Sequence, residues 1–254
     1  MRTLPGVPSR YEAVNLVVVG NTERFYADRN VLEGDAELRI SPEMVVSLRV
    51  VSRRECLRIA QYASDLARRR AAQRGRPVRV TVVHKLNVLR RGDGLFLDCC
   101  REVAAGYPDV AFDDAHVDAA AYSLVRDRQR YDVLVTTNLF GDILSGQAAG
   151  LVGSLGLAPS LNAGEHHAMA QAVHGLAPDI AGKGIANPIA EVLSAAMLFD
   201  WLGRRPRDPA ASRAGRFLEE AVRAALAQGA RTPDLGGSHT TAQFTRALRQ
   251  AILG

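Results

Sequence analysis

The sequence has few cysteines, few aromatic residues and no long apolar run. Its three cysteines are Cys56, Cys99 and Cys100, and no second adjacent pair is present to complete a zinc site, so we expect reduced structural thiols. Aromatic residues make up 6% of the chain and rarely interleave with its scattered arginines, which disfavours nucleic-acid binding. No run reaches the length of a membrane span and no leader pattern is visible, so we expect a cytoplasmic protein without a membrane partner.

The remaining composition is that of an ordinary α/β enzyme. The 254 residues are 47% hydrophobic and 23% charged, which suits one large domain or two small ones. The net charge is +5, and arginine runs such as residues 68–70 fall on helical stretches. We interpret them as solvated helix faces rather than a nucleic-acid surface.

The first 150 residues alternate between strand and helix patterns. Strands are predicted at 14–19, 48–52, 76–83 and 133–137, and helices at about 52–70, 95–105, 119–128 and from 141 onward. Residues 27–48 have mixed charge and resemble an arm more than a core element. This alternation predicts an α/β fold.

After Gly156 the pattern changes to helices and loops with hardly a strand. Helices are predicted at about 189–202, 211–228 and 240–253, with loops at 157–164 and 174–188 and a short apolar piece at 169–173. These helices have no sheet of their own to cover. We therefore expect an exposed apolar face here, or a partner chain that covers it.

The stretch 131–156 carries a candidate site at its centre. A buried strand delivers Asn138 and Asp142 to the start of a helix, which is where α/β proteins usually place their sites. Two carboxylates one turn apart there could hold a hard divalent cation, but the second position is Gly146. On spacing alone Asp142 could equally cap the helix.

Other candidates are single residues at the ends of elements. Lys85 leaves an apolar strand, so it could carry a proton after desolvation lowers its pKa, or it could extend to solvent. Asp118 lies just before a helix, where a helix cap is the plainer interpretation. Tyr26 could be a phenolic acid or a packing residue.

The loop 174–188 combines three glycines and two prolines with polar side chains. Glycine lets a backbone approach a ligand closely, and Asp179 could accept the ribose hydroxyls of NAD and repel the extra phosphate of NADP. The GxGxxG pattern is absent, so a standard Rossmann site is not expected. A purely structural loop remains the alternative.

Four motifs together resemble the isocitrate/isopropylmalate dehydrogenases. They are VHKLNVLRRGDGLFLD at 83–98, NLFGDILSG at 138–146, HGLAPDIAGKGIANP at 174–188 and TPDLGG at 232–237. This family comprises metal-dependent oxidative decarboxylases of 2-hydroxy acids, including homoisocitrate and tartrate enzymes. The resemblance implies an isopropylmalate-dehydrogenase-like α/β fold. It implies a small dimerisation and active-site domain at 1–151 with an arm at 27–48. Residues 152–254 would be the C-terminal part of the NAD-binding large domain, and about a hundred N-terminal residues of the family would lack a counterpart.

The resemblance also implies roles for single residues. Lys85, contributed across a dimer interface, and Tyr26 are similar to the catalytic pair. Asp142 and Asp118, the latter also supplied by the partner subunit, are similar to ligands of Mg or Mn. The cofactor-binding positions that match are Asn87, His174, Gly175, Ala177, Asp179 and Asn187. The implied partners are NAD, a small-molecule hydroxy acid and a second copy of the chain that shares the active sites.

The sequence departs from the family pattern at five positions, two of which are Arg24, where a glycine is usual, and Leu176, where a serine is usual. Gly146 stands where the family has its second helical metal carboxylate, and Val19 and Gly20 stand where it usually has Arg-Glu. Losing one of three carboxylates should weaken cation binding, and losing an arginine should weaken recognition of a substrate carboxylate. Two hypotheses follow: an NAD- and Mg/Mn-dependent oxidative decarboxylase of a 2-hydroxy dicarboxylic acid, or a truncated, catalytically impaired homologue that acts as a non-catalytic or interaction protein.

Overall fold

The computed structural model describes residues 1–11, 14–20, 37–204 and 208–253. The chain forms two compact units, one of Asn15–Gln147 and one of Met1–Val14 together with Ala148–Gly254. The boundary falls inside one helix. That these units are a dimerisation domain and part of a cofactor domain stays a prediction.

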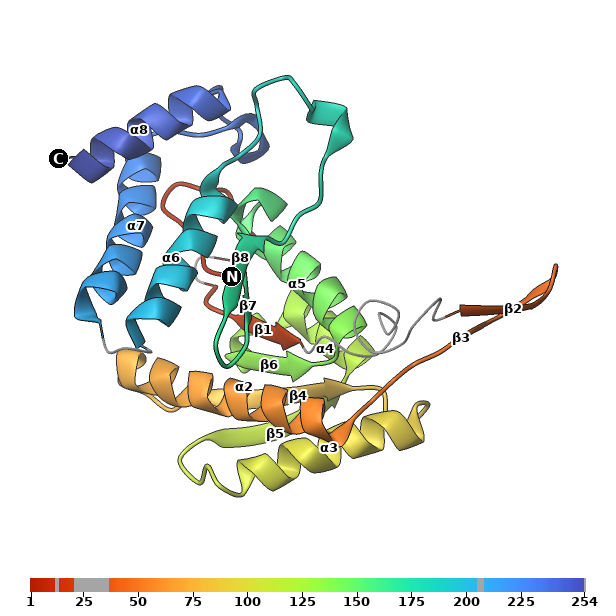
Figure 1. The fold of residues 1–254 in the computed structure, drawn as a ribbon. Coiled ribbons are helices and arrows are strands. Elements are labelled where there is room, and N and C mark those ends of the chain that lie inside the picture. Colours follow the sequence, from red (N-terminus) through yellow and green to blue (C-terminus); the bar gives the residue numbers. More distant parts are fainter. Residues whose placement is uncertain (12–13, 21–36, 205–207, 254) are drawn as a thin grey trace. The chain divides into compact units, whose positions relative to one another are not determined.

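A parallel four-stranded sheet is the centre of the unit 15–147 (Figure 1). Its order is β1 (Val17–Gly20), β6 (Val133–Thr136), β4 (Arg79–His84) and β5 (Ala111–His116). All residues of β6 are buried, as are those of β4 after its first, which explains their continuous apolar runs. The predicted α/β fold is confirmed.

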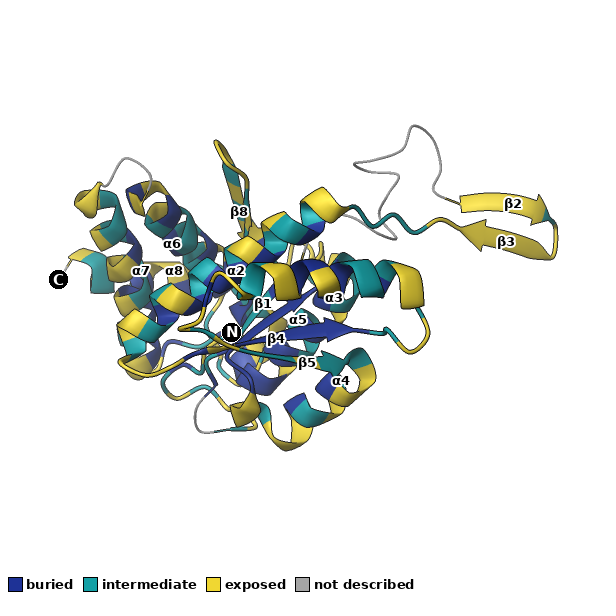
Figure 2. Ribbon diagram, turned by 90° about the horizontal axis from the view of Figure 1, so that it is seen from below, coloured by how far each residue is buried: buried dark blue, intermediate teal, exposed yellow. Residues whose placement is uncertain are grey.

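Helices cover this sheet on both sides. Figure 2 shows α2 (Arg53–Arg74) and α3 (Arg90–Ala104) on one side of the strands and α4 (Val117–Arg126) on the other. Ser52 begins α2 by accepting the Glu55 N–H at 3.3 Å, and Gly75 ends it in the left-handed conformation, so the predicted cap is confirmed. A short 3₁₀ turn at Arg128–Arg130 precedes β6, and α5 (Asn138–Val152) follows it.

An antiparallel hairpin, β2 (Glu37–Ser41) with β3 (Met44–Ser47), belongs to the same unit. Figure 2 shows it exposed on both faces. Its exposed apolar side chains are Leu38, Ile40, Met44, Val45 and Val46. The strand predicted at 48–52 is wrong, since these residues have no strand pairing. Arg49 of this segment instead reaches across to α3.

The other unit is built on a small hairpin and three helices. β7 (Pro159–Ala163) pairs antiparallel with β8 (Ala168–Ala172), and both pack on α6 (Ile189–Arg204). The prediction of a loop at 157–164 is therefore wrong. This segment has few β-branched residues, so its sequence does not indicate a strand, and packing on α6 fixes the strand instead. α7 (Pro209–Ala227) packs on α6, and α8 (Thr241–Leu253) packs on α7. Short 3₁₀ turns lie at Leu155–Leu157, Pro178–Ile180 and Pro233–Leu235.

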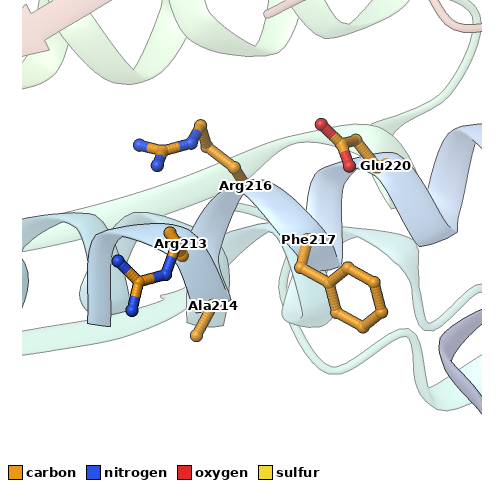
Figure 3. A pocket seen from close by; sticks show the side chains of 5 residues that line it. All are labelled: Arg213, Ala214, Arg216, Phe217 and Glu220. Atoms are coloured by element: carbon orange, nitrogen blue, oxygen red, sulfur yellow. The ribbon is translucent and has the colours of Figure 1, made fainter. Parts of the chain in front are cut away.

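This unit buries part of its apolar surface and leaves single apolar side chains exposed. The expectation that its helices have no sheet of their own is wrong, since β7 and β8 pack on α6, and the exposed apolar face or covering partner chain stays a prediction. Ile189, Val222 and Phe244 are fully buried, whereas Phe199 on α6 and Phe217 on α7 are exposed. Figure 3 shows a hollow beside Phe217 whose lining residues all come from α7, so it is a surface depression. No helix in the described ranges is both long and apolar enough to cross a membrane.

Candidate active site

The structure brings together two of the predicted site residues, Lys85 and Asp118. Lys85 follows the last residue of β4, and Asp118 lies in the first turn of α4, which begins directly after β5. The Lys85 Nζ donates a hydrogen bond of 2.7 Å to Asp118 Oδ1. The two neighbouring parallel strands thus place both side chains at the carboxyl edge of the sheet, where α/β sites form.

This ion pair is open to solvent. The Lys85 side chain is 25% exposed and that of Asp118 is 67% exposed. The hydrogen bond from Lys85 holds the pKa of the Asp118 carboxyl below its ordinary value. An exposed ion pair contributes little to folding, so Lys85 and Asp118 can each leave the other and bind a charged ligand instead.

Two buried side chains, His84 and Asp93, contact the Lys85 turn. Neither is among the residues predicted for the site. Asp93 accepts the Lys85 N–H, and His84 accepts the Leu86 N–H. A signal was available for Asp93. It falls on the buried stripe of α3 with Phe96, Leu97 and Cys100, where a lone carboxylate demands a partner.

Asp142 and Gly146 lie on α5, and the helix begins earlier than expected. Because α5 starts at Asn138, Asp142 is an interior helix residue and the helix-cap alternative is excluded. A Cβ built at Gly146 would meet no atom within 4 Å, so the missing carboxylate leaves open space. Across the described residues no group of three His, Cys, Asp or Glu side chains could hold a metal ion. Within a single copy, the part of the chain that the structure describes therefore does not supply a complete divalent-cation site.

The glycine-rich loop, residues 174–188, is mostly exposed. Ala177 adopts the left-handed conformation with φ 45°, as do Gly182 and Gly184 with φ 75° and 64°. Cβ atoms built at Gly175, Gly182 and Gly184 would meet nothing within 4 Å. His174 and Asp179 are exposed, and the hydrogen bonds of residues 174–183 are local. This loop offers an open main chain and a carboxylate to a ligand.

Asn187 closes this loop through a polar cluster centred on Asp234. Its amide Nδ2 donates to Asp234 Oδ2 at 2.9 Å, while its Oδ1 accepts the Ile189 N–H at 3.0 Å. Ser154 and Thr232 also donate to the Asp234 carboxylate, at 2.5 and 2.6 Å. Asp234 is the residue of the TPDLGG motif that anchors the loop end, a role that spacing alone could not reveal.

The other predicted residues are not brought into this geometry. Asn87 lies exposed in the turn after Lys85, and Tyr26 lies outside the described residues. Val19 is 7% exposed and packs within the sheet's hydrophobic core. The catalytic and cofactor roles of all the predicted residues stay predictions.

Comparisons with known proteins agree on one family. The isocitrate/isopropylmalate dehydrogenase family matches this chain over residues 5–248. A 3-isopropylmalate dehydrogenase from Archaeoglobus fulgidus is 43% identical over 99% of this chain and 71% of its own length. An isocitrate/homoisocitrate dehydrogenase from Thermus thermophilus is 45% identical over 97% of this chain and 68% of its own. The crystal structure of isocitrate dehydrogenase from Methylococcus capsulatus matches with TM-score 0.87 and 43% identity, covering 99% of this chain and 71% of that one.

Proposed function

The chain belongs to the isocitrate/isopropylmalate dehydrogenase family, and we propose that it is an NAD-dependent dehydrogenase that oxidises and decarboxylates a 2-hydroxy dicarboxylic acid. The observation that carries this proposal is the Lys85–Asp118 pair at the carboxyl edge of the sheet. The relatives named above are dehydrogenases of isopropylmalate, isocitrate and homoisocitrate, which supports the substrate class.

The chemistry assigned to this pair is the handling of one proton. Lys85, in its neutral form, takes the proton of the substrate hydroxyl as the carbon beneath it is oxidised. Asp118 then accepts a hydrogen bond from the ammonium group that results, through the contact of 2.7 Å between Lys85 Nζ and Asp118 Oδ1. Bound NAD would accept the hydride that leaves the same carbon.

The glycine-rich loop is the proposed site for the adenosine side of NAD. Its glycines leave open space where a Cβ would stand, which lets main-chain groups approach a ligand. Asp179 is an exposed carboxylate that can accept two ribose hydroxyls and repel a 2′-phosphate. The loop thus supports NAD over NADP.

A homodimer is proposed from two exposed apolar surfaces of the unit 15–147. The hairpin β2–β3 is a two-stranded sheet that is only marginally stable by itself, and it exposes apolar side chains on both faces. Tyr122 on α4 and Ile143 on α5 are 62% and 55% exposed. Tyr122 lies one helical turn from Asp118, and Ile143 is next to Asp142. A second copy bound at these residues would therefore meet the predicted site residues.

The direct test is NADH production by the purified chain, followed at 340 nm. The chain is given NAD, a millimolar concentration series of Mn²⁺ and, separately, isocitrate, isopropylmalate, homoisocitrate and tartrate. We expect NADH with at least one of these acids and none with their analogues that lack the 2-hydroxyl group. Absence of NADH with all four acids would contradict the proposal.

Gly146 favours a second function, that of a non-catalytic homologue. With one helical carboxylate absent, Mn²⁺ with NAD should raise the melting temperature of this chain little. Gly146→Asp should increase the Mn²⁺-dependent shift to several degrees, since open space surrounds the new side chain. A shift of several degrees in the original chain would refute this second function. Recovery of NADH production only in Gly146→Asp would establish it.

A further inference from the structure

We infer that Asp93 and Arg49 are positioning residues for Lys85. The buried carboxylate, held by the arginine, accepts the main-chain N–H of Lys85 and sets where the lysine side chain leaves the sheet. This inference rests on the proposed function, because a fixed lysine serves chemistry only if Lys85 handles the substrate proton.

The main chain of Lys85 has its hydrogen-bonding groups fixed from within the fold. Pairing between β4 and β5 ends at His84, so the next N–H needs a partner outside the ladder. That partner is Asp93, whose Oδ2 lies 2.5 Å from the Lys85 nitrogen and whose side chain is fully buried. The Lys85 carbonyl accepts two N–H groups, from Val88 at 3.0 Å and from Leu89 at 2.8 Å.

Arg49 gives the Asp93 carboxylate a charged partner in this buried place. Its guanidinium donates to Asp93 Oδ1, so each oxygen of the carboxylate has its own donor. A buried carboxylate without such a partner would cost free energy and lose its charge. Gly92 leaves room for the arginine, because a Cβ there would lie 3.2 Å from Arg49 Nη1 and 3.1 Å from Val51 Cγ2.

The neighbouring N–H group is held in the same way. His84 Nδ1 accepts the Leu86 N–H at 3.2 Å, and its Nε2 lies 3.1 Å from Asp114 Oδ2. This geometry assigns the proton of the imidazole to Nε2. Two consecutive main-chain N–H groups are thus held by buried side chains at the point where Lys85 turns toward Asp118.

Asp132 supplies a matched control at the opposite end of the same strand. It is 11% exposed, binds Arg74 and Arg76, and accepts the Arg79 N–H at 3.3 Å where β4 begins. Its chemistry is that of Asp93, but no contact joins it to the Lys85 turn. If Asp93 has only a structural role, removing Asp93 and removing Asp132 should affect Lys85 equally. If Asp93 positions Lys85, the two removals should affect Lys85 differently.

The chain is well suited to the test, because it has only two lysines, Lys85 and Lys183. Selective ¹³C,¹⁵N-lysine labelling of the full chain therefore gives two main-chain and two side-chain NMR signals, which Lys85→Arg assigns. Asp93→Ala should speed exchange of the Lys85 amide proton about tenfold and move its side-chain signals toward those of exposed Lys183. Asp93→Asn keeps an oxygen acceptor and should restore part of the amide protection. Asp132→Ala should leave the Lys85 signals in place.

Equal Lys85 signals and exchange in Asp93→Ala and Asp132→Ala would overturn the inference. If Asp93→Ala does not fold, Gly92→Ala crowds Arg49 without removing the pair, and it should shift the Lys85 signals in the same direction. Unchanged Lys85 signals in Gly92→Ala would also overturn it. Because these measurements observe Lys85 itself, a chain that produces no NADH still gives a result.

Discussion

The Lys85 turn and the glycine-rich loop both carry predicted site residues, yet they are built in opposite ways. In the Lys85 turn, buried polar side chains accept consecutive main-chain N–H groups. In the loop, residues 174–179 are exposed and, within the described part of the chain, form hydrogen bonds only within residues 174–181. A reactive side chain has to be held before the ligand arrives, whereas main chain that binds a ligand has to stay open to it. The two regions suit these two tasks.

Each region contains one of the two lysines. Lys85 is 25% exposed and paired with Asp118, while Lys183 lies exposed between two glycines of left-handed conformation. This difference makes Lys183 a control for every experiment on Lys85. A general effect of removing a lysine charge would appear at both positions.

The largest expected difference between the regions is in stability. Asp93→Ala should lower the free energy of unfolding by about 3–5 kcal/mol, because it leaves Arg49 with its charge unpaired in a largely buried position. Asp179→Ala in the loop should change it by less than about 0.5 kcal/mol, since the residue is exposed. Urea unfolding followed by circular dichroism measures both. Equal losses would remove the distinction between the two regions.

A second prediction concerns Asp132, the buried carboxylate at the end of β4 opposite to Lys85. Burial by itself raises the pKa of Asp132, but the hydrogen bond from Arg76 and the charge of Arg74 outweigh it, so the pKa is lowered. The stability that Asp132 contributes is therefore present above the pKa of the unfolded chain, about 4, and is lost as the pH falls below it. Asp132→Asn should cost about 3 kcal/mol at neutral pH and progressively less in acid. A cost that does not change with pH would contradict the lowered pKa.

The smallest expected effects lie in the loop backbone. Gly182→Ala should cost about 1 kcal/mol, since the left-handed conformation strains any residue with a Cβ although nothing crowds that atom. Ala177→Gly should stabilise the chain slightly, by less than about 1 kcal/mol, because it relieves the same strain at φ 45°. Thermal unfolding of both variants gives the comparison. Stabilisation by Gly182→Ala or destabilisation by Ala177→Gly would show that the loop conformation differs from the one described.

Local features of the fold could be predicted from sequence, whereas distant pairings could not. The Ser52 cap and the buried strand 133–136 follow from neighbouring residues, whereas α2 ends at Gly75, later than the predicted end near residue 70. The Arg49–Asp93 pair joins residues 44 positions apart, and no local pattern reports it. The hairpin 159–172 was missed for a similar reason, because its strands are fixed by packing on α6 rather than by β-prone residues.

The candidate site divides in the same manner. Lys85 was recognisable from its place after an apolar strand, but its contact with Asp118 depends on how β4 and β5 pair. Asp142 was predicted at the start of a helix, and the early start of α5 changes its place to the helix interior. Asp93 falls on the buried stripe of α3, which is a signal that the sequence carries, whereas Asp234 acts through Asn187 and no pattern at its own position indicates that role.

The central claim is that the lysine at the end of β4 handles the substrate proton, and the rate of NADH formation tests it most directly. The best substrate of the four acids is used with NAD and Mn²⁺, and Lys85→Met is compared with Lys183→Met. We expect Lys85→Met to lose about a hundredfold or more of the rate, while Lys183→Met keeps it within a few-fold. A rate in Lys85→Met equal to that of the unaltered chain would show that Lys85 does not handle the proton.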